Sequence, residues 1–131
     1  MAQCNISFTA RRGTLRGMHY QSAPRQEAKL VRCSRGSIYD VLLDLRPHSP
    51  TFKRWEAVSL TAENCRTIYV LAGVAHGFQT LVDTTEVFYQ ISEFYAEQCV
   101  RGIRWDDPTF AIDWPIKNPF SDRDRTQPLW S

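Results

Sequence analysis

The feature that most constrains this chain is a succession of short β-branched and aromatic runs separated by turn residues. The strongest run covers residues 38–45, where Asp40 and Asp44 share one face of an extended strand. The same criteria predict strands at 14–21, 29–33, 55–60, 67–71, 74–81 and 85–95. No long 3.6-residue periodicity develops, and residues 61–64 favour at most a single helical turn. An all-β barrel, sandwich or jelly roll is expected.

The two ends of the chain give weaker signals. Residues 3–10 are short and mixed, and from residue 101 the chain turns irregular, with turn signals at 105–108 and 113–115. We find no repeat, low-complexity tract or linker. Because 131 residues with 43% hydrophobic content can bury a core without disulfides or metal, one domain spanning 1–131 is predicted.

Charge and cysteine usage exclude several partners. Sixteen Lys and Arg against fourteen Asp and Glu leave a formal charge of +2, too balanced for a protein that neutralises many phosphates, so nucleic acid is not expected. The apolar runs fall short of the roughly 18 residues that span a bilayer. The four cysteines form no Cys-x-x-Cys motif, which favours reduced thiols in a cytoplasmic protein, although an even count also permits disulfides in a secreted chain.

One segment concentrates candidate functional side chains. Residues 13–21 read Gly-Thr-Leu-Arg-Gly-Met-His-Tyr-Gln and place Arg16 and His19 between two glycines, and Lys29 follows ten residues after the histidine. Glycines let backbone and ligand approach closely. A lone strand histidine is more often packed and hydrogen-bonded in a core, but beside two cations His19 is a candidate base.

Seven segments in order resemble the dTDP-4-dehydrorhamnose 3,5-epimerase family. They are GTLRGMHYQ (13–21), KLVR (29–32), DVLLD (40–44), SPTF (49–52), AHGF (75–78), GIRWDDP (102–108) and IDWP (112–115). The resemblance runs from about residue 3 to residue 129. It implies a cupin-type jelly roll (a double-stranded β-helix), a homodimer, and a cofactor-free epimerase acting on a dTDP-linked 4-keto-6-deoxy sugar.

The chemistry of such a reaction can be argued independently. Inverting a carbon next to a ketone needs a base on one face, an acid on the other and a cation that stabilises the enolate oxygen. His19 is the expected base, because its ordinary pKa lies near neutrality. Lys29 is assigned to the enolate oxygen. Tyr89 occupies the position of the family's proton donor, and a phenol stays protonated at neutral pH.

The resemblance adds further site residues. Asp124 matches the aspartate that holds the family's catalytic histidine; without the resemblance, it would be one more surface charge. Arg16 and His76 match pocket residues that contact the substrate, and Arg16 suits a diphosphate oxygen. Gln3 and Asn5 resemble the family's Gln-x-Asn pair, and Arg123 matches a basic substrate contact. Tyr89 taken alone would be core packing.

The sequence also departs from the family pattern. The resemblance implies an N-terminal section with an early strand that helps hold the nucleotide, and this sequence begins after it. Val100, Phe94 and Leu71 stand where a glutamate, a stacking tyrosine and a proline are common. We therefore expect a complete catalytic set and a reduced nucleotide-holding set.

Two alternatives stay open at this point. Cupins often bind a metal, so His19 and His76 with Glu86 or Asp40 would form a mononuclear site of an isomerase or dioxygenase. A closely spaced His-x-His pair, which such cupins usually show, is absent from the sequence. The other alternative is a non-catalytic sugar-nucleotide-binding cupin. The sequence leaves open whether C3, C5 or both are inverted.

Overall fold

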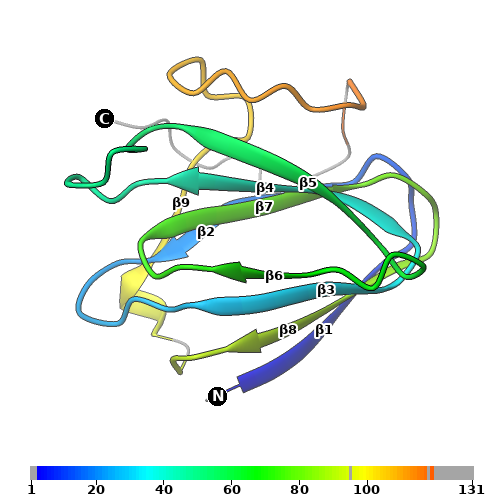
Figure 1. The fold of residues 1–131 in the computed structure, drawn as a ribbon, viewed down its shortest axis with the longest axis horizontal. Helices are drawn as coiled ribbons and strands as arrows, with labels where there is room; N and C mark the ends of the chain where they lie inside the picture. The colour runs from blue at the N-terminus through cyan, green and yellow to red at the C-terminus, as the bar shows by residue number, and fades with distance from the viewer. Residues whose placement is uncertain (1–2, 95, 118, 120–131) are drawn as a thin grey trace.

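The computed structural model describes residues 3–94, 96–117 and 119, and its regular elements there are almost entirely β-strands (Figure 1). The strands are β1 (Gln3–Thr9), β2 (Leu15–Gln21), β3 (Lys29–Arg35), β4 (Ser37–Asp44), β5 (Trp55–Thr61), β6 (Thr67–Val70), β7 (Val74–Thr80), β8 (Thr85–Ile91) and β9 (Val100–Gly102). A single 3-10 turn, η1 (Glu97–Cys99), precedes β9.

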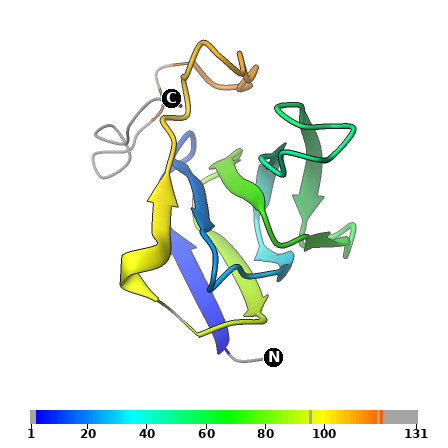
Figure 2. The same ribbon diagram turned by 90° about the vertical axis from the view of Figure 1, so that its left-hand side faces the viewer.

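The strands form two antiparallel sheets. The first sheet has the order β1-β8-β3-β6 and the second the order β5-β4-β7-β2-β9. Most neighbours within a sheet are distant in sequence, as in a jelly roll. In Figure 2, β9 (yellow) lies at the edge of the second sheet and leads into the orange segment. The architecture confirms the predicted all-β, cupin-type jelly roll.

Most strand predictions agree with the structure to within one or two residues. Three differ. Residues 3–9, for which no strand was predicted, form edge strand β1, because pairing with β8 supplies an order that their mixed composition does not signal. The strand expected at 85–95 ends at Ile91. Residues 62–64 form a turn instead of a helical start.

The space between the two sheets holds an inner cluster of apolar side chains. Alternation along each strand turns every second residue toward the facing sheet. The inner cluster consists of Val31, Cys33, Ile38, Leu60, Val70, Phe78 and Val87. Burying each of the larger members contributes roughly 1.5–3 kcal/mol, so this cluster holds the two sheets together.

A second, outer cluster lies on the opposite face of the second sheet. It consists of Leu15, Met18, Val41, Leu43, Leu45, Ala75, Ile103, Phe110 and Trp114. Its last three members come from the segment after β9, which crosses this face in Figure 1. Trp114 Nε1 donates to the Trp105 carbonyl at 2.9 Å and fixes that segment. The second sheet is therefore packed on both faces.

Two further observations concern the sequence predictions. All four cysteines are free thiols, two exposed and two buried. Within the described part of the chain, no helix has the length and apolar content that crossing a membrane requires.

Candidate active site

A bulge in β2 brings two predicted site residues to the same face of the second sheet. In a regular strand, residues three apart point to opposite faces. Here the register shifts between Arg16 and His19, so that Arg16 lies opposite Phe78 and His19 opposite His76. Since those two residues of β7 share a face, Arg16 and His19 also share it. Both side chains then face the first sheet.

Two glycines let β2 and β7 approach closely at the bulge. Gly17 has φ +131°, and a Cβ added to it would lie 2.5 Å from the Gly77 Cα. A Cβ on Gly77 would in turn lie 2.6 Å from the Met18 sulfur. No side chain fits at Gly17 without moving backbone. The close approach therefore depends on glycine at the bulge between Arg16 and His19.

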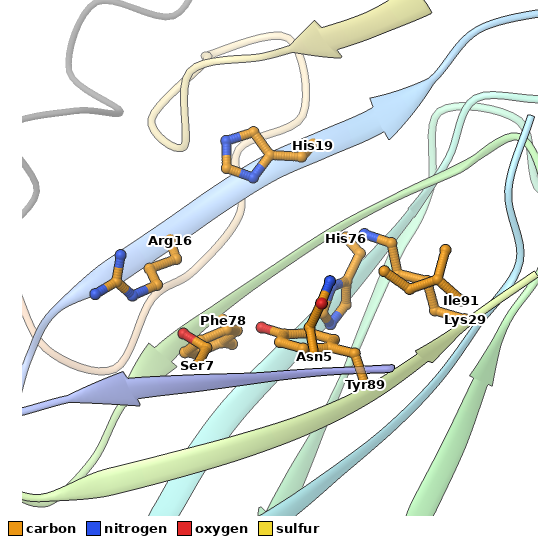
Figure 3. A pocket seen from close by; sticks show the side chains of 9 residues that line it. All are labelled: Asn5, Ser7, Arg16, His19, Lys29, His76, Phe78, Tyr89 and Ile91. Atoms are coloured by element: carbon orange, nitrogen blue, oxygen red, sulfur yellow. The ribbon is translucent and has the colours of Figure 1, made fainter. Parts of the chain in front are cut away.

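A polar cavity of about 350 Å³ opens between the two sheets (Figure 3). Arg16 and His19 project from β2 on one side, and Asn5, Ser7 and Tyr89 from the first sheet on the other. The lining is Asn5, Ser7, Arg16, His19, Lys29, His76, Phe78, Tyr89 and Ile91. The structure thus gathers six of the nine predicted site residues around one cavity.

Tyr89 lies across the cavity from the β2 residues. Its ring meets the His76 ring edge-to-face, with centroids 6.2 Å apart and planes at 83°. Burial raises the pKa of Tyr89 far above its ordinary value, the charge of Asp40 raises it further, and Arg16 partly opposes the shift. The phenol therefore keeps its proton throughout the neutral range.

Asp40 is a site residue whose role the sequence did not reveal. Its Oδ2 shares a hydrogen bond of 2.8 Å with His76 Nε2, and both side chains are buried. Among the described residues, Asp40 Oδ1 has no hydrogen-bond partner. Burial raises the pKa of Asp40, while His76 and Lys29 oppose the shift. The carboxyl fixes the orientation of the His76 ring. The shared strand face of Asp40 and Asp44 was the available sequence signal.

The two cations of the cavity have different partners. Lys29 Nζ lies 3.5 Å from Glu27 Oε1, and both side chains are only 13% exposed. Arg16 Nε donates to the Thr9 hydroxyl at 3.1 Å. In Figure 3, Arg16 and Lys29 stand at opposite ends of the cavity. The cavity therefore has one end with an ion pair and one end with a guanidinium beside a neutral hydroxyl.

The remaining predicted site residues lie elsewhere. Gln3 lines an adjoining cavity of about 480 Å³, which shares Asn5, His19 and Ile91 with the first. Asp124 and Arg123 lie outside the described residues, so their roles stay predictions. Ser7 and Phe78 line the cavity without having been predicted; their strand positions gave no chemical signal.

The donor set for a metal ion is not assembled in the described part of the chain. No three His, Cys, Asp or Glu side chains there lie close enough to hold one. Glu86, one of the expected ligands, has the opposite strand parity to Tyr89 and hydrogen-bonds Ser34 on the outside of the first sheet. It is separated from His19 and His76 by the sheet itself.

Fold and cavity together define the class of protein. A jelly roll whose polar cavity opens between its sheets is a cupin-type protein with a site for a small molecule. The side chains around the cavity suit proton transfer: two histidines, a phenol with a raised pKa and a lysine.

Comparisons with known proteins place the chain within this class. The sequence profile described as dTDP-4-dehydrorhamnose 3,5-epimerase matches residues 1–131. The enzyme of that name from Sinorhizobium fredii is 42% identical over 98% of this chain and 67% of its own length. The crystal structure of the Bacillus anthracis enzyme with TDP and pyrophosphate bound superposes with a TM-score of 0.95, at 46% identity over 98% of this chain and 74% of that one.

A third relative is named for epimerisation at a single position. It is a 3'-monoepimerase from Streptomyces bikiniensis in complex with dTDP-quinovose, with a TM-score of 0.89 and 39% identity over 98% of this chain and 65% of that one. The chain belongs to the dTDP-4-dehydrorhamnose 3,5-epimerase family. It spans 56% to 68% of the length of eight curated relatives that it matches.

Proposed function

We propose that this protein epimerises a dTDP-linked 4-keto-6-deoxy sugar at carbons next to its ketone. The single observation that carries the proposal is the placement of His19 and Tyr89 on opposite sides of one cavity, in different sheets. A sugar between them presents one face to a base and the other to an acid. Inversion requires that arrangement, because the proton must leave one face and return to the other.

His19 takes the proton from the carbon next to the ketone. The electrons of the broken C–H bond move into an enolate, whose oxygen gains negative charge. The Lys29 ammonium stabilises that charge within the partly closed cavity. Asp124 is proposed as the partner that holds the His19 ring and stabilises its protonated form.

Tyr89 returns a proton to the opposite face, and the phenolate and the protonated His19 are then restored by proton exchange with water. The raised pKa of Tyr89 keeps the phenol protonated until a strongly basic carbanion forms beside it. The His76 ring packs edge-on against Tyr89 and is itself fixed by Asp40. Arg16, Asn5, Gln3 and Arg123 are proposed to bind the nucleotide portion. The mechanism uses side chains alone.

Heavy water tests the proposal directly. The protein is incubated in D₂O with dTDP-4-keto-6-deoxyglucose, and deuterium at C3 and C5 is followed by NMR. Incorporation at both carbons is expected. If neither carbon incorporates deuterium while the sugar nucleotide still binds, the result would instead support the non-catalytic sugar-nucleotide-binding cupin.

A second candidate, the mono-epimerase, is favoured by the Streptomyces relative, whose activity is confined to the 3' position in its name. Both reactions use the same base, acid and cation, so the side chains of the cavity support either. In the same experiment, deuterium at C3 only would assign the narrower activity.

A homodimer is proposed on the outer surface of the first sheet. Ile6 and Phe8 on edge strand β1 are 63% and 54% exposed, and Tyr69 on β6 is 55% exposed. An edge strand with outward apolar side chains suits a second copy of the chain. Light scattering should give the mass of a dimer, and Ile6→Lys with Phe8→Lys should give a monomer.

The cytoplasm is the proposed location. Four free thiols, two of them exposed, suit a reducing compartment. Detection of the protein in the cytosolic fraction of fractionated cells would support this location, whereas its recovery outside the cytosol would contradict it.

A further inference from the structure

The Glu27–Lys29 ion pair is a feature of the site that the proposed mechanism does not use. Glu27 precedes β3 and lines the adjoining cavity, while Lys29 lines the main one. The carboxylate and the ammonium are 3.5 Å apart, and both side chains are largely buried. The pair therefore stands where the two cavities meet.

The backbone around Glu27 is held in place on both sides. The Ala28 amide donates to the Ser92 hydroxyl at 2.8 Å, and the Ser92 amide donates to the Ala28 carbonyl at 2.9 Å. The Gln21 side chain donates to the Arg25 carbonyl at 2.6 Å and accepts from the Ala96 amide at 3.0 Å. Glu27 is thus positioned by the fold and does not lie on a loose surface loop.

The pair makes the two ends of the cavity electrostatically unequal. At one end, Glu27 offsets the charge of Lys29. At the other, Arg16 bonds the neutral Thr9 hydroxyl, and it takes part in no ion pair within the described residues. An anionic group entering the cavity is attracted to Arg16 and is opposed by Glu27 near Lys29.

Other charged or titratable groups around Lys29 do not produce this asymmetry. They are Arg16 and His19 on β2, Asp40 on β4, His76 on β7 and Tyr89 on β8. Asp40 is hydrogen-bonded to His76 and does not itself line the cavity. Glu27 is the carboxylate whose removal would expose the ammonium of Lys29 to an anion.

We infer that Glu27 is a specificity-determining residue that sets the direction in which the substrate enters. Its carboxylate excludes a diphosphate from the Lys29 end, so the diphosphate binds at the Arg16 end and the uncharged keto sugar lies against Lys29. The inference rests on the proposed function for the identity of the substrate. The discrimination against anions at Lys29 rests on the geometry alone.

Inorganic pyrophosphate is the probe that tests the discrimination without any turnover. Glu27→Gln keeps the size and polarity of the side chain and removes its charge. In titration calorimetry at low ionic strength, Glu27→Gln should bind pyrophosphate about tenfold more tightly than the wild type. Adding Lys29→Met should return the affinity to the wild-type value, and Glu27→Asp should keep it there.

Glu86→Gln is the matched control, because it removes the same charge from the outer surface of the first sheet, away from the cavity. It should leave pyrophosphate affinity unchanged. An affinity that does not rise in Glu27→Gln, or that rises equally in Glu86→Gln, overturns the inference. A rise that persists with Lys29→Met overturns it as well. Thermal melting confirms that each variant is folded.

Turnover supplies the second readout. A substrate that also binds backwards in Glu27→Gln should lower kcat and KM together by about tenfold and leave kcat/KM within about twofold. A fall in kcat/KM with KM unchanged contradicts the inference, since that result means that Glu27 acts on the transition state. If the wild type incorporates no deuterium, the epimerase proposal fails, while the pyrophosphate result still decides the role of Glu27.

Discussion

The two faces of the second sheet are built by the same strands and do different work. The inner face of β2 and β7 carries Arg16, His19 and His76 around an open cavity. The outer face of the same strands carries Leu15 and Met18, both fully buried, under the segment after β9. One face exposes polar groups to a ligand, and the other removes apolar area from water.

The difference shows how the fold tolerates a cavity beside its core. Open space and buried polar groups cost stability where apolar packing would stabilise. Here the outer cluster packs the backs of the strands that carry the site, so the positions of those strands do not depend on the cavity being filled. We therefore expect substitutions on the inner face to change catalysis and substitutions on the outer face to change stability.

The largest expected effect is on the inner face. His19→Asn should lower the rate of deuterium incorporation by about 10³-fold, because the base is lost. Its melting temperature should stay within a few degrees of the wild type, since the His19 side chain is only half-buried. Rates come from NMR in D₂O and stability from calorimetry. An exchange rate that stays near the wild-type value would reject His19 as the base.

The second prediction concerns Gly17 in β2, a strand that contributes side chains to both faces. Gly17→Ala should destabilise the fold by roughly 3 kcal/mol, because the new Cβ meets the Gly77 Cα at 2.5 Å and φ is +131°. Gly13→Ala is the control: φ is also positive, but the nearest contact is the movable side chain of Ile116 at 3.2 Å. It should cost about 1 kcal/mol. If urea unfolding shows that both variants lose the same free energy of unfolding, the close approach of β2 and β7 does not require glycine at position 17.

The bulge at Gly17 also marks the limit of what the sequence could predict. Alternation correctly predicted that Asp40 and Asp44 share a strand face and that the chain is all-β, whereas the jelly roll was implied by the segment resemblance. The same rule would put Arg16 and His19 on opposite faces, and only the register shift brings them together. The segment resemblance predicted both as site residues, but it gave no geometry.

The hydrogen bond between Asp40 and His76 was not predicted, for a related reason, although the two residues were grouped as alternative metal ligands. They come from different strands, 36 residues apart, and a pairing of this kind depends on strand order, which a periodic pattern does not specify. Residues 3–9 were not predicted as a strand because their order depends on the distant partner β8. Local patterns predicted elements, whereas long-range register created the site.

The third prediction is for the outer face. Leu43→Ala should lower the free energy of unfolding by about 3 kcal/mol, since the side chain is fully buried in the outer cluster and leaves a cavity. The kcat of the folded protein should stay within about twofold of the wild type. Urea unfolding and steady-state kinetics measure the two quantities. A large loss of kcat in the folded variant would show that the two faces are coupled.

The smallest effect compares two carboxylates on the inner face of β4. Burial raises the pKa of Asp40, whereas hydrogen bonds from Arg46, Ser49 and Thr51 hold the pKa of Asp44 well below its ordinary range. The contribution of Asp40 to stability is therefore fully present below the unfolded pKa, near 4, and is lost as pH rises through its folded pKa. That of Asp44 is present above about pH 4 and is lost as pH falls.

Asp40→Asn and Asp44→Asn should consequently show opposite pH dependence in urea unfolding. Between pH 4 and pH 7, the stability of the wild type relative to Asp40→Asn should decline as pH rises. Below pH 4, the stability of the wild type relative to Asp44→Asn should decline as pH falls. Asp40→Asn should also lower kcat/KM by roughly tenfold, because the His76 ring loses the carboxyl that orients it. If the free energy of unfolding of both variants differs from that of the wild type by an amount independent of pH, the pKa values of Asp40 and Asp44 are not shifted in opposite directions.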